Sequence, residues 1–227
     1  MKTLGVLCLS NNGVYDGVDP DFGQGLADPR RYKRSPILRR IPTAWTSNVV
    51  PGDPKCADEY AKAARELVQE GADAITCDCG FTVRYQQAIA DAVSVPVSTS
   101  SLLLLPMLLS NVPANKKVAV LTYDSRYLDA GIMAALSIKD TSRLVIEGLE
   151  GTETYAYMWA QKGQIRVADA LSDTDAIIER VRKREDVAAI LCECTFFARV
   201  SPRIRSATGL PVYDAALNAA LLMAAAG

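Results

Sequence analysis

The sequence predicts an α/β protein of two pseudo-symmetric lobes, each a doubly wound parallel sheet, with the active site in the cleft between them. Two observations support this prediction. Short buried runs alternate with longer helical patterns along the chain, which is typical of parallel sheets covered by helices on both faces. In addition, the second half of the chain repeats the pattern of the first at a constant offset, which indicates an internal repeat.

The predicted strands and helices follow from periodicity and end signals. Asp53-Pro54 supplies an N-cap and a first-turn proline for one helix, which Gly71 closes, and Ser172–Thr174 offers caps for a second. The strands are predicted from runs of β-branched and apolar residues. These runs are Val6–Leu9, Ala74–Cys77, Val95–Val97, Val118–Thr122, Val187–Cys192 and Leu210–Tyr213.

The repeat is clearest around two cysteines. Cys79 and Cys194 lie 115 positions apart. The same offset joins Cys77 to Cys192, Phe81 to Phe196, Arg84 to Arg199 and Pro96 to Pro211. We therefore expect one lobe, containing Cys79, to comprise approximately residues 1–100 plus 212–227, and the other, containing Cys194, residues 101–211.

Composition excludes several classes of protein. The 25 Lys and Arg residues nearly balance 26 Asp and Glu residues, and the net charge is −1. The sequence has no basic patch of the kind that would predict nucleic acid or an anionic membrane as the partner. Its apolar runs are too short to span a bilayer. Six cysteines without a recognisable secretory signal predict free thiols in the cytoplasm. The chain has no histidine, so the commonest general base and metal ligand are absent.

Residues that follow strands are the candidate site residues, because open α/β sheets bind ligands at the carboxyl ends of their strands. They are Ser10 and Asn11, Cys79 to Phe81 (with Gly80 between), Ser98 to Ser100, Asp124 and Ser125, Cys194 to Phe196, and Asp214. Residues 12–52 have no clean period. They are either a functional loop or an ordinary insertion.

The two cysteines suggest a particular chemistry. Each ends a buried strand and is followed by a small residue that opens a predicted helix. A thiol among the free N–H groups of a helix N-terminus is expected to have a lowered pKa, and the same N–H groups can hold a carboxylate. Two such thiols on opposite walls of a cleft could remove a proton beside a carboxylate and return one on the other face.

Here the chain resembles the aspartate/glutamate racemase superfamily. The resemblance lies in Cys79-Gly80-Phe81, the segment 95–101 and Glu193-Cys194-Thr195. It implies a cofactor-independent racemase in which Cys79 and Cys194 are the acid/base pair. It also implies that the substrate, a small carboxylate such as an acidic amino acid, contacts Ser10, Asn11, Thr99, Ser100 and Thr195. No cofactor or metal is expected, and the protein could be a homo-oligomer. Having both cysteines favours racemisation or isomerisation over the superfamily's arylmalonate decarboxylase branch, which resembles a one-cysteine version of this site.

Other functions, and other roles for several of these residues, remain open. A hydantoin racemase or maleate isomerase could use the same thiols, and a binding module could close on a ligand without chemistry. Cys77 and Cys192 are interpreted as packing residues, although Cys-X-Cys pairs could also form a Cys₄ metal site. Asp78 and Glu193 are expected to point away from the thiols and receive no role. Arg84 and Arg199 could bind a second carboxylate or lie on a solvated helix face.

Overall fold

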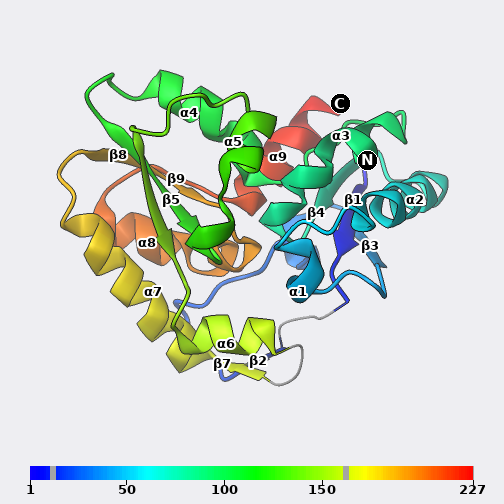
Figure 1. Ribbon diagram of the computed structural model, residues 1–227. Helices are drawn as coiled ribbons and strands as arrows, with labels where there is room; N and C mark the ends of the chain where they lie inside the picture. Colours follow the sequence, from blue (N-terminus) through cyan, green and yellow to red (C-terminus); the bar gives the residue numbers. More distant parts are fainter. Residues whose placement is uncertain (11–13, 161–163, 227) are drawn as a thin grey trace.

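Two parallel β-sheets lie side by side in the computed structural model, which describes residues 1–10, 14–160 and 164–226 (Figure 1). The first sheet has the order β3-β1-β4 and consists of β3 (Ile37–Arg40), β1 (Leu4–Cys8) and β4 (Ala74–Cys77). The second has the order β6-β5-β8-β9 and consists of β6 (Leu144–Gly148), β5 (Lys117–Thr122), β8 (Val187–Cys192) and β9 (Val212–Tyr213). The predicted α/β fold class is confirmed.

The two sheets correspond strand by strand. Leu7 of β1 is in register with Cys77 of β4, and Leu121 of β5 is in register with Cys192 of β8. Val97 forms a parallel bridge to Ile75 at the place that β9 occupies beside β8. Strand β3 corresponds to β6. The repeat in the sequence is therefore a repeat of the pairing pattern as well.

Helices cover both sheets (Figure 1). The α-helices are α1 (Thr46–Val49), α2 (Cys56–Gln69), α3 (Gln86–Asp91), α4 (Leu105–Asn111), α5 (Ala130–Ala135), α6 (Glu153–Trp159), α7 (Val167–Arg182), α8 (Ser201–Thr208) and α9 (Ala215–Ala225). The 3₁₀ helices are η1 (Pro29–Arg31), η2 (Gly80–Tyr85), η3 (Ser101–Leu104), η4 (Ser125–Tyr127) and η5 (Thr195–Arg199). A small parallel pair, β2 (Val14–Asp16) and β7 (Gln164–Arg166), joins the halves.

The last helix of each half packs on the sheet of the other half. Helix α4 follows the first-sheet bridge at Val97 and contacts β5 of the second sheet. Helix α9 follows β9 of the second sheet, and its Ala215 and Ala219 pack with Leu4 and Val6 of β1. The predicted division assigned residues 212–227 to the first lobe. In the structure β9 pairs in the second sheet, and α9 packs on the first.

Some elements differ from the sequence expectation. Strands β4 and β8 have the predicted bounds, whereas only Val97 of the predicted strand 95–97 pairs, and it does so through an isolated bridge. Helix α7 begins at Val167, ahead of the predicted caps at Ser172–Thr174, because Val167, Ala170 and Leu171 are buried and extend its apolar face. Strands β3 and β6 were not predicted.

No helix among the described residues is long and apolar enough to cross a membrane.

Candidate active site

Cys79 and Cys194 occupy equivalent places in the two lobes. Each follows the end of a buried strand, β4 or β8, by two residues and has an extended backbone, and each is the N-cap of a 3₁₀ helix, η2 or η5. The chain turns at Gly80 and Thr195, so each thiol stays at the carboxyl end of its sheet. The predicted position of both cysteines between a strand and a helical turn is correct, although the turn is 3₁₀ and short.

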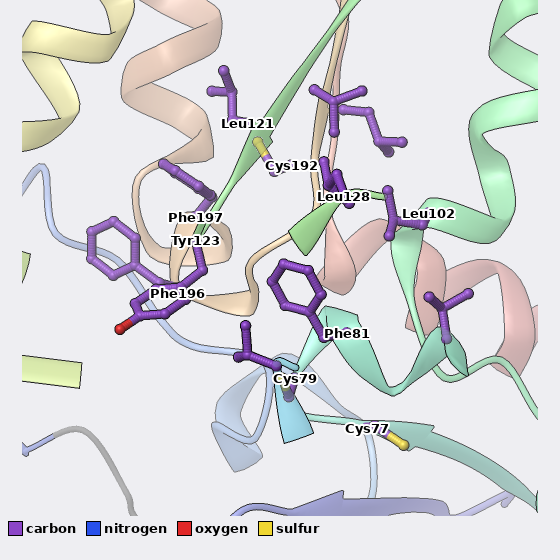
Figure 2. Packing of buried hydrophobic residues seen from close by; sticks show 14 of the residues in the cluster. Cys77, Cys79, Phe81, Leu102, Leu121, Tyr123, Leu128, Cys192, Phe196 and Phe197 are labelled. Atoms are coloured by element: carbon purple, nitrogen blue, oxygen red, sulfur yellow. The ribbon is translucent and has the colours of Figure 1, made fainter. Parts of the chain in front are cut away.

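Both cysteines line one cavity of about 360 Å³. Its walls come from the two lobes and from the segment that links β1 to α2. The cavity-lining residues of the two lobes are Leu9, Asp78, Cys79, Gly80, Phe81, Tyr123, Met158, Glu193, Cys194, Thr195, Phe196 and Arg199. Figure 2 shows Cys79 and Phe81 of the first lobe in the same packed cluster as Tyr123 and Phe196 of the second.

Backbone N–H groups point to both sulfur atoms. The N–H of Phe81 donates to Cys79 and that of Phe196 donates to Cys194, and each contact lowers the pKa of its thiol. Opposing effects are larger. Burial, and then the negative charges of Glu193 and Asp78, raise the pKa of both thiols above the ordinary value. The sequence-based expectation of a lowered pKa is therefore wrong for the free protein. The reason is that two short turns cannot offset burial beside two carboxyl groups.

From the sequence, Asp78 and Glu193 were expected to point away from the thiols and to have no role in the site. Both line the cavity. Asp78 Oδ1 accepts the N–H of Leu9 at 2.9 Å. Glu193 Oε2 accepts the Thr122 hydroxyl at 2.8 Å and the N–H of Tyr123 at 3.1 Å. Burial raises the pKa of Asp78 to about 6 and that of Glu193 to about 7.

The lobes meet at these same residues. The Thr195 hydroxyl of the second lobe donates to the carbonyl oxygen of Asp78 in the first. Gly80 packs against Glu193: a Cβ on Gly80 would overlap with the Glu193 carbonyl oxygen and Oε1, and would lie 2.9 Å from Cδ. The relative position of the two thiols is therefore fixed by direct contacts between their neighbours.

The other predicted substrate contacts divide into two groups. Gly80, Phe81, Thr195 and Phe196 line the cavity together with the two cysteines. Ser10, Thr99, Ser100 and Asp124 are not among the lining residues. Asn11 lies outside the described residues.

The residues away from the cavity have structural partners. The Thr99 N–H and hydroxyl both donate to Gln86 Oε1 at 2.9 Å. Ser100 caps η3 by accepting the N–H of Leu102. The fully buried Asp124 caps η4 and accepts bonds from Arg126 and Tyr155. Position at the end of a strand predicted the turns that carry the thiols. It did not predict which polar side chains after other strands would line the cavity.

The sequence left open whether residues 12–52, between β1 and α2, form a functional loop, and it named none of the residues there that line the cavity. Tyr15, residues 25–29, Thr46 and Val50 all line the cavity. This segment is therefore a wall of the candidate site. Its irregular sequence was the available signal, but nothing in it indicated which residues would face the thiols.

The two equivalent arginines have different surroundings. Arg84 bonds to Tyr127 O at 2.8 Å and to Asp129 Oδ2 at 2.9 Å, so it connects the lobes away from the cavity. Arg199 lines the cavity. Its guanidinium lies 4.4 Å from the centre of the Tyr15 ring and 5.4 Å from that of Phe22, and donates to Gly23 O at 3.0 Å. Neither arginine lies on a solvated helix face.

Within residues 1–10, 14–160 and 164–226, no three Cys, Asp or Glu side chains gather as a metal-binding group would require. The Cys₄ alternative therefore has no ligand set in this part of the chain. Cys77 and Cys192 are buried in the apolar core, as the packing interpretation requires.

Comparison with solved structures identifies the class of fold. Unliganded arylmalonate decarboxylase aligns over 100% of this chain and 93% of its own, with a TM-score of 0.60 and 19% identity. Allantoin racemase from Pseudomonas fluorescens aligns over 98% and 90%, with a TM-score of 0.58 and 16% identity. An aspartate racemase homologue from Pyrococcus horikoshii OT3 aligns over 100% and 99%, with a TM-score of 0.57 and 13% identity. The chain has the fold of the aspartate/glutamate racemase superfamily.

Curated proteins with greater sequence similarity have a different name. The chain is 32% identical over 179 residues to dimethylsulfoniopropionate lyase 5 of Emiliania huxleyi, covering 72% of this chain and 36% of that protein. It is 31% identical over 177 residues to dimethylsulfoniopropionate lyase of Durusdinium sp. clade D, covering 73% and 57%. The chain thus spans between about a third and little more than half of these relatives. No protein-family model matches it. A dimethylsulfoniopropionate lyase was not among the functions expected from the sequence.

Proposed function

We propose that the chain is a cofactor-independent enzyme that removes a proton from the carbon beside a carboxylate, with Cys79 and Cys194 as the two acid/base groups. One observation carries this proposal. Thiols from equivalent turns of the two lobes line the same cavity, and each accepts a backbone N–H from the residue two positions later. These N–H groups are the donors that would stabilise either sulfur as a thiolate.

Racemisation is the first candidate reaction. The thiolate of one cysteine takes the α-proton and becomes a thiol, while the electron pair of the broken C–H bond spreads into the carboxylate. The opposite thiol then gives its proton to the other face of the carbon and becomes the thiolate. Thiols from two lobes on one cavity suit this exchange, and so does the racemase fold of the structural neighbours. Arg199 is the cavity-lining cation that could hold a carboxylate.

β-Elimination is the second candidate, and the names of the curated relatives favour it. The first step is the same. The electron pair then forms a C=C bond while the C–S bond breaks, and neutral dimethyl sulfide leaves with the electrons of that bond. The cavity suits a sulfonium cation, because the aromatic residues Tyr15, Tyr123 and Phe196 and the acidic residue Asp78 are among those that line it.

The two reactions have different products and can be tested together. The protein is incubated in D₂O with racemisable amino acids, hydantoins and, separately, 3-dimethylsulfoniopropionate. Proton NMR follows loss of the α-proton signal, chiral chromatography follows the enantiomers, and gas chromatography follows dimethyl sulfide. Cys79→Ser and Cys194→Ser are compared with Cys56→Ser, which changes a free buried cysteine outside the cavity lining.

We expect racemisation or elimination in the wild type and Cys56→Ser proteins, and its loss in the other two, which should keep at most slow proton exchange on one enantiomer. Deuterium in both enantiomers identifies a racemase, whereas dimethyl sulfide with acrylate identifies a lyase. Full turnover in either cavity-cysteine variant would contradict the two-thiol proposal.

A further inference from the structure

A carboxyl group precedes each thiol, and both carboxyl groups are held in the same way. The Asp78 N–H donates to Leu7 O at 3.0 Å and its carboxylate accepts from Leu9 N. In the second lobe the Glu193 N–H donates to Leu121 O at 2.7 Å and its carboxylate accepts from Tyr123 N. The two arrangements are related by the repeat. In each lobe, these two hydrogen bonds connect the end of the cysteine-bearing strand, β4 or β8, to the end of the adjacent strand, β1 or β5.

Glu193 differs from Asp78 in how deeply it lies between the lobes. It is only 1% exposed. It directly precedes Cys194, and its Oε1 occupies the space where a side chain of Gly80, the neighbour of Cys79, would otherwise lie. One carboxyl group therefore lies next to both thiol-bearing turns, although these turns come from different lobes.

We propose that Glu193 is a positioning residue that acts through both thiols: its carboxyl group must hold a proton for Cys79 or Cys194 to become a thiolate. The inference rests on the proposed function in that the two thiols are the reacting groups. A second negative charge in this buried space would oppose ionisation of either sulfur, because little water is present to screen it. A protonated Glu193 removes that opposition while its contacts with the end of β5 hold the turn in place.

The charges on these groups support this coupling. Ionised Glu193 raises the pKa of Cys79 and of Cys194, second only to burial in each case. The pKa of Glu193 itself, raised by burial to about 7, allows the group to gain or lose a proton near neutrality. Other titratable or charged groups face the same space and act with it. Tyr15, Asp78, Tyr123 and Arg199 line the cavity with Glu193, and ionised Glu193 also raises the pKa of the buried Cys192 thiol.

The proposal is tested on the thiols without substrate. Iodoacetamide labelling rates of Cys79 and Cys194 are measured by peptide mass spectrometry from pH 6.5 to 9.5 in wild type, Glu193→Gln and Glu193→Asp. Glu150→Gln is the matched control, because Glu150 also accepts bonds at the end of a second-sheet strand but does not line the cavity. Circular dichroism confirms folding of each variant.

We expect Glu193→Gln to label both cysteines about tenfold faster or more at pH 8, which corresponds to about one unit of thiol pKa. Glu193→Asp should remain close to wild type, and Glu150→Gln should be unchanged. If Glu193→Gln does not fold, Thr122→Val provides the second arm. Loss of the Thr122 hydroxyl removes a donor that stabilises ionised Glu193, so labelling should again be faster at pH 8, by a smaller factor.

Equal labelling profiles in wild type and the folded variants would overturn the inference and would leave Glu193 as a strand-end contact alone. This outcome is distinguishable from failure of the proposed function, because labelling requires no turnover. A chain that neither exchanges protons nor eliminates could still show the Glu193 effect, and an active chain could lack it.

Discussion

Gly80 of the first lobe packs directly against Glu193 of the second, and no space for a side chain remains between them. Gly80→Ala would force the Glu193 backbone and the two thiol turns apart, since a backbone oxygen cannot rotate away as a side chain can. We expect a loss of about 1–3 kcal/mol in the free energy of unfolding and a large loss of activity. Urea denaturation and turnover measure the two effects.

Gly131→Ala is the matched control for this variant. A Cβ there would first meet Asp129 Oδ1 at 3.2 Å, which is the end of a side chain, and alanine favours the α5 helix. Stability should be unchanged or slightly higher. If the Gly80→Ala protein were as stable and active as wild type, the lobes would have to be able to move apart at this contact.

The two cavity cysteines should differ in the enantiomer that they serve if the chain racemises. Each thiol would face one side of the substrate, so Cys79→Ser and Cys194→Ser should each retain slow α-proton exchange on opposite enantiomers, because serine is a poorer acid and base. Deuterium incorporation into separate D and L substrates measures this preference. The same preference in both variants would contradict the assignment of one thiol to each face.

Stability should fall as the pH rises from about 5 to 7.5. Native Glu193 holds its proton up to a pKa of about 7, whereas its ordinary pKa is 4.5. Between these values the folded state binds the extra proton, so raising the pH favours the unfolded state, by up to about 1.4 kcal/mol per pH unit. Asp78 adds the same trend from 3.8 to about 6. Urea unfolding in Glu193→Gln should show a shallower fall, and an unchanged slope would contradict the raised pKa.

Arg84 should contribute to stability at neutral pH more than at pH 3. Its guanidinium, with the side chain 16% exposed, joins Tyr127 O and Asp129 across the lobes. Arg84→Met should cost about 1 kcal/mol at pH 7, because the part-buried Tyr127 carbonyl loses its donor and the half-exposed Asp129 carboxylate, 47% exposed, loses its cation. Arg84 lowers the pKa of Asp129 in the folded protein. The ionic contribution to the free energy of unfolding is therefore fully present above the ordinary carboxyl pKa, and it is lost as the pH falls through the lowered pKa of the folded state. An equal cost at pH 3 would exclude an ionic contribution.

Arg199→Met should weaken substrate binding and loosen the segment 14–32. The guanidinium lies over the rings of Tyr15 and Phe22 and bonds to Gly23 O, so its loss frees this cavity wall from η5. We expect a higher KM, by about tenfold or more, and faster tryptic cleavage in residues 30–34. Arg203→Met, which loses ion pairs to Asp21 and Asp175 outside the cavity, is the control for KM. Unchanged KM in Arg199→Met would exclude a role in binding.

The sequence predicted the thiol turns well because short-range patterns determine them. Strands β4 and β8 are continuous apolar runs with clear ends, and their repetition identified Cys79 and Cys194 together. The roles of Asp78 and Glu193 could not be predicted in this way. Strand alternation suggested that these side chains leave the site, but the strands end at Cys77 and Cys192, so the alternation no longer applies to them.

Long-range packing was also beyond the sequence pattern. Arg84 and Arg199 are related by the repeat, yet one joins the lobes and the other lines the cavity. The difference arises because the segment 14–32 has aromatic rings that contact only Arg199. Strand β3 has alternating half-buried and exposed residues in a polar stretch, Ile37–Arg40, and a run of four such residues carries little signal.

The exchange of α4 and α9 between the sheets bears on how such a chain could have arisen. If an ancestral gene encoded one half, its product would have left one sheet face bare, because the covering helix extends away from its own strands. Two identical copies that exchanged these helices would have covered the bare sheet face of each copy, as in a domain-swapped dimer. Fusion of the two genes would then have allowed each half to change separately. Glycine at position 80, where the other half has Thr195, is one such difference between the present halves.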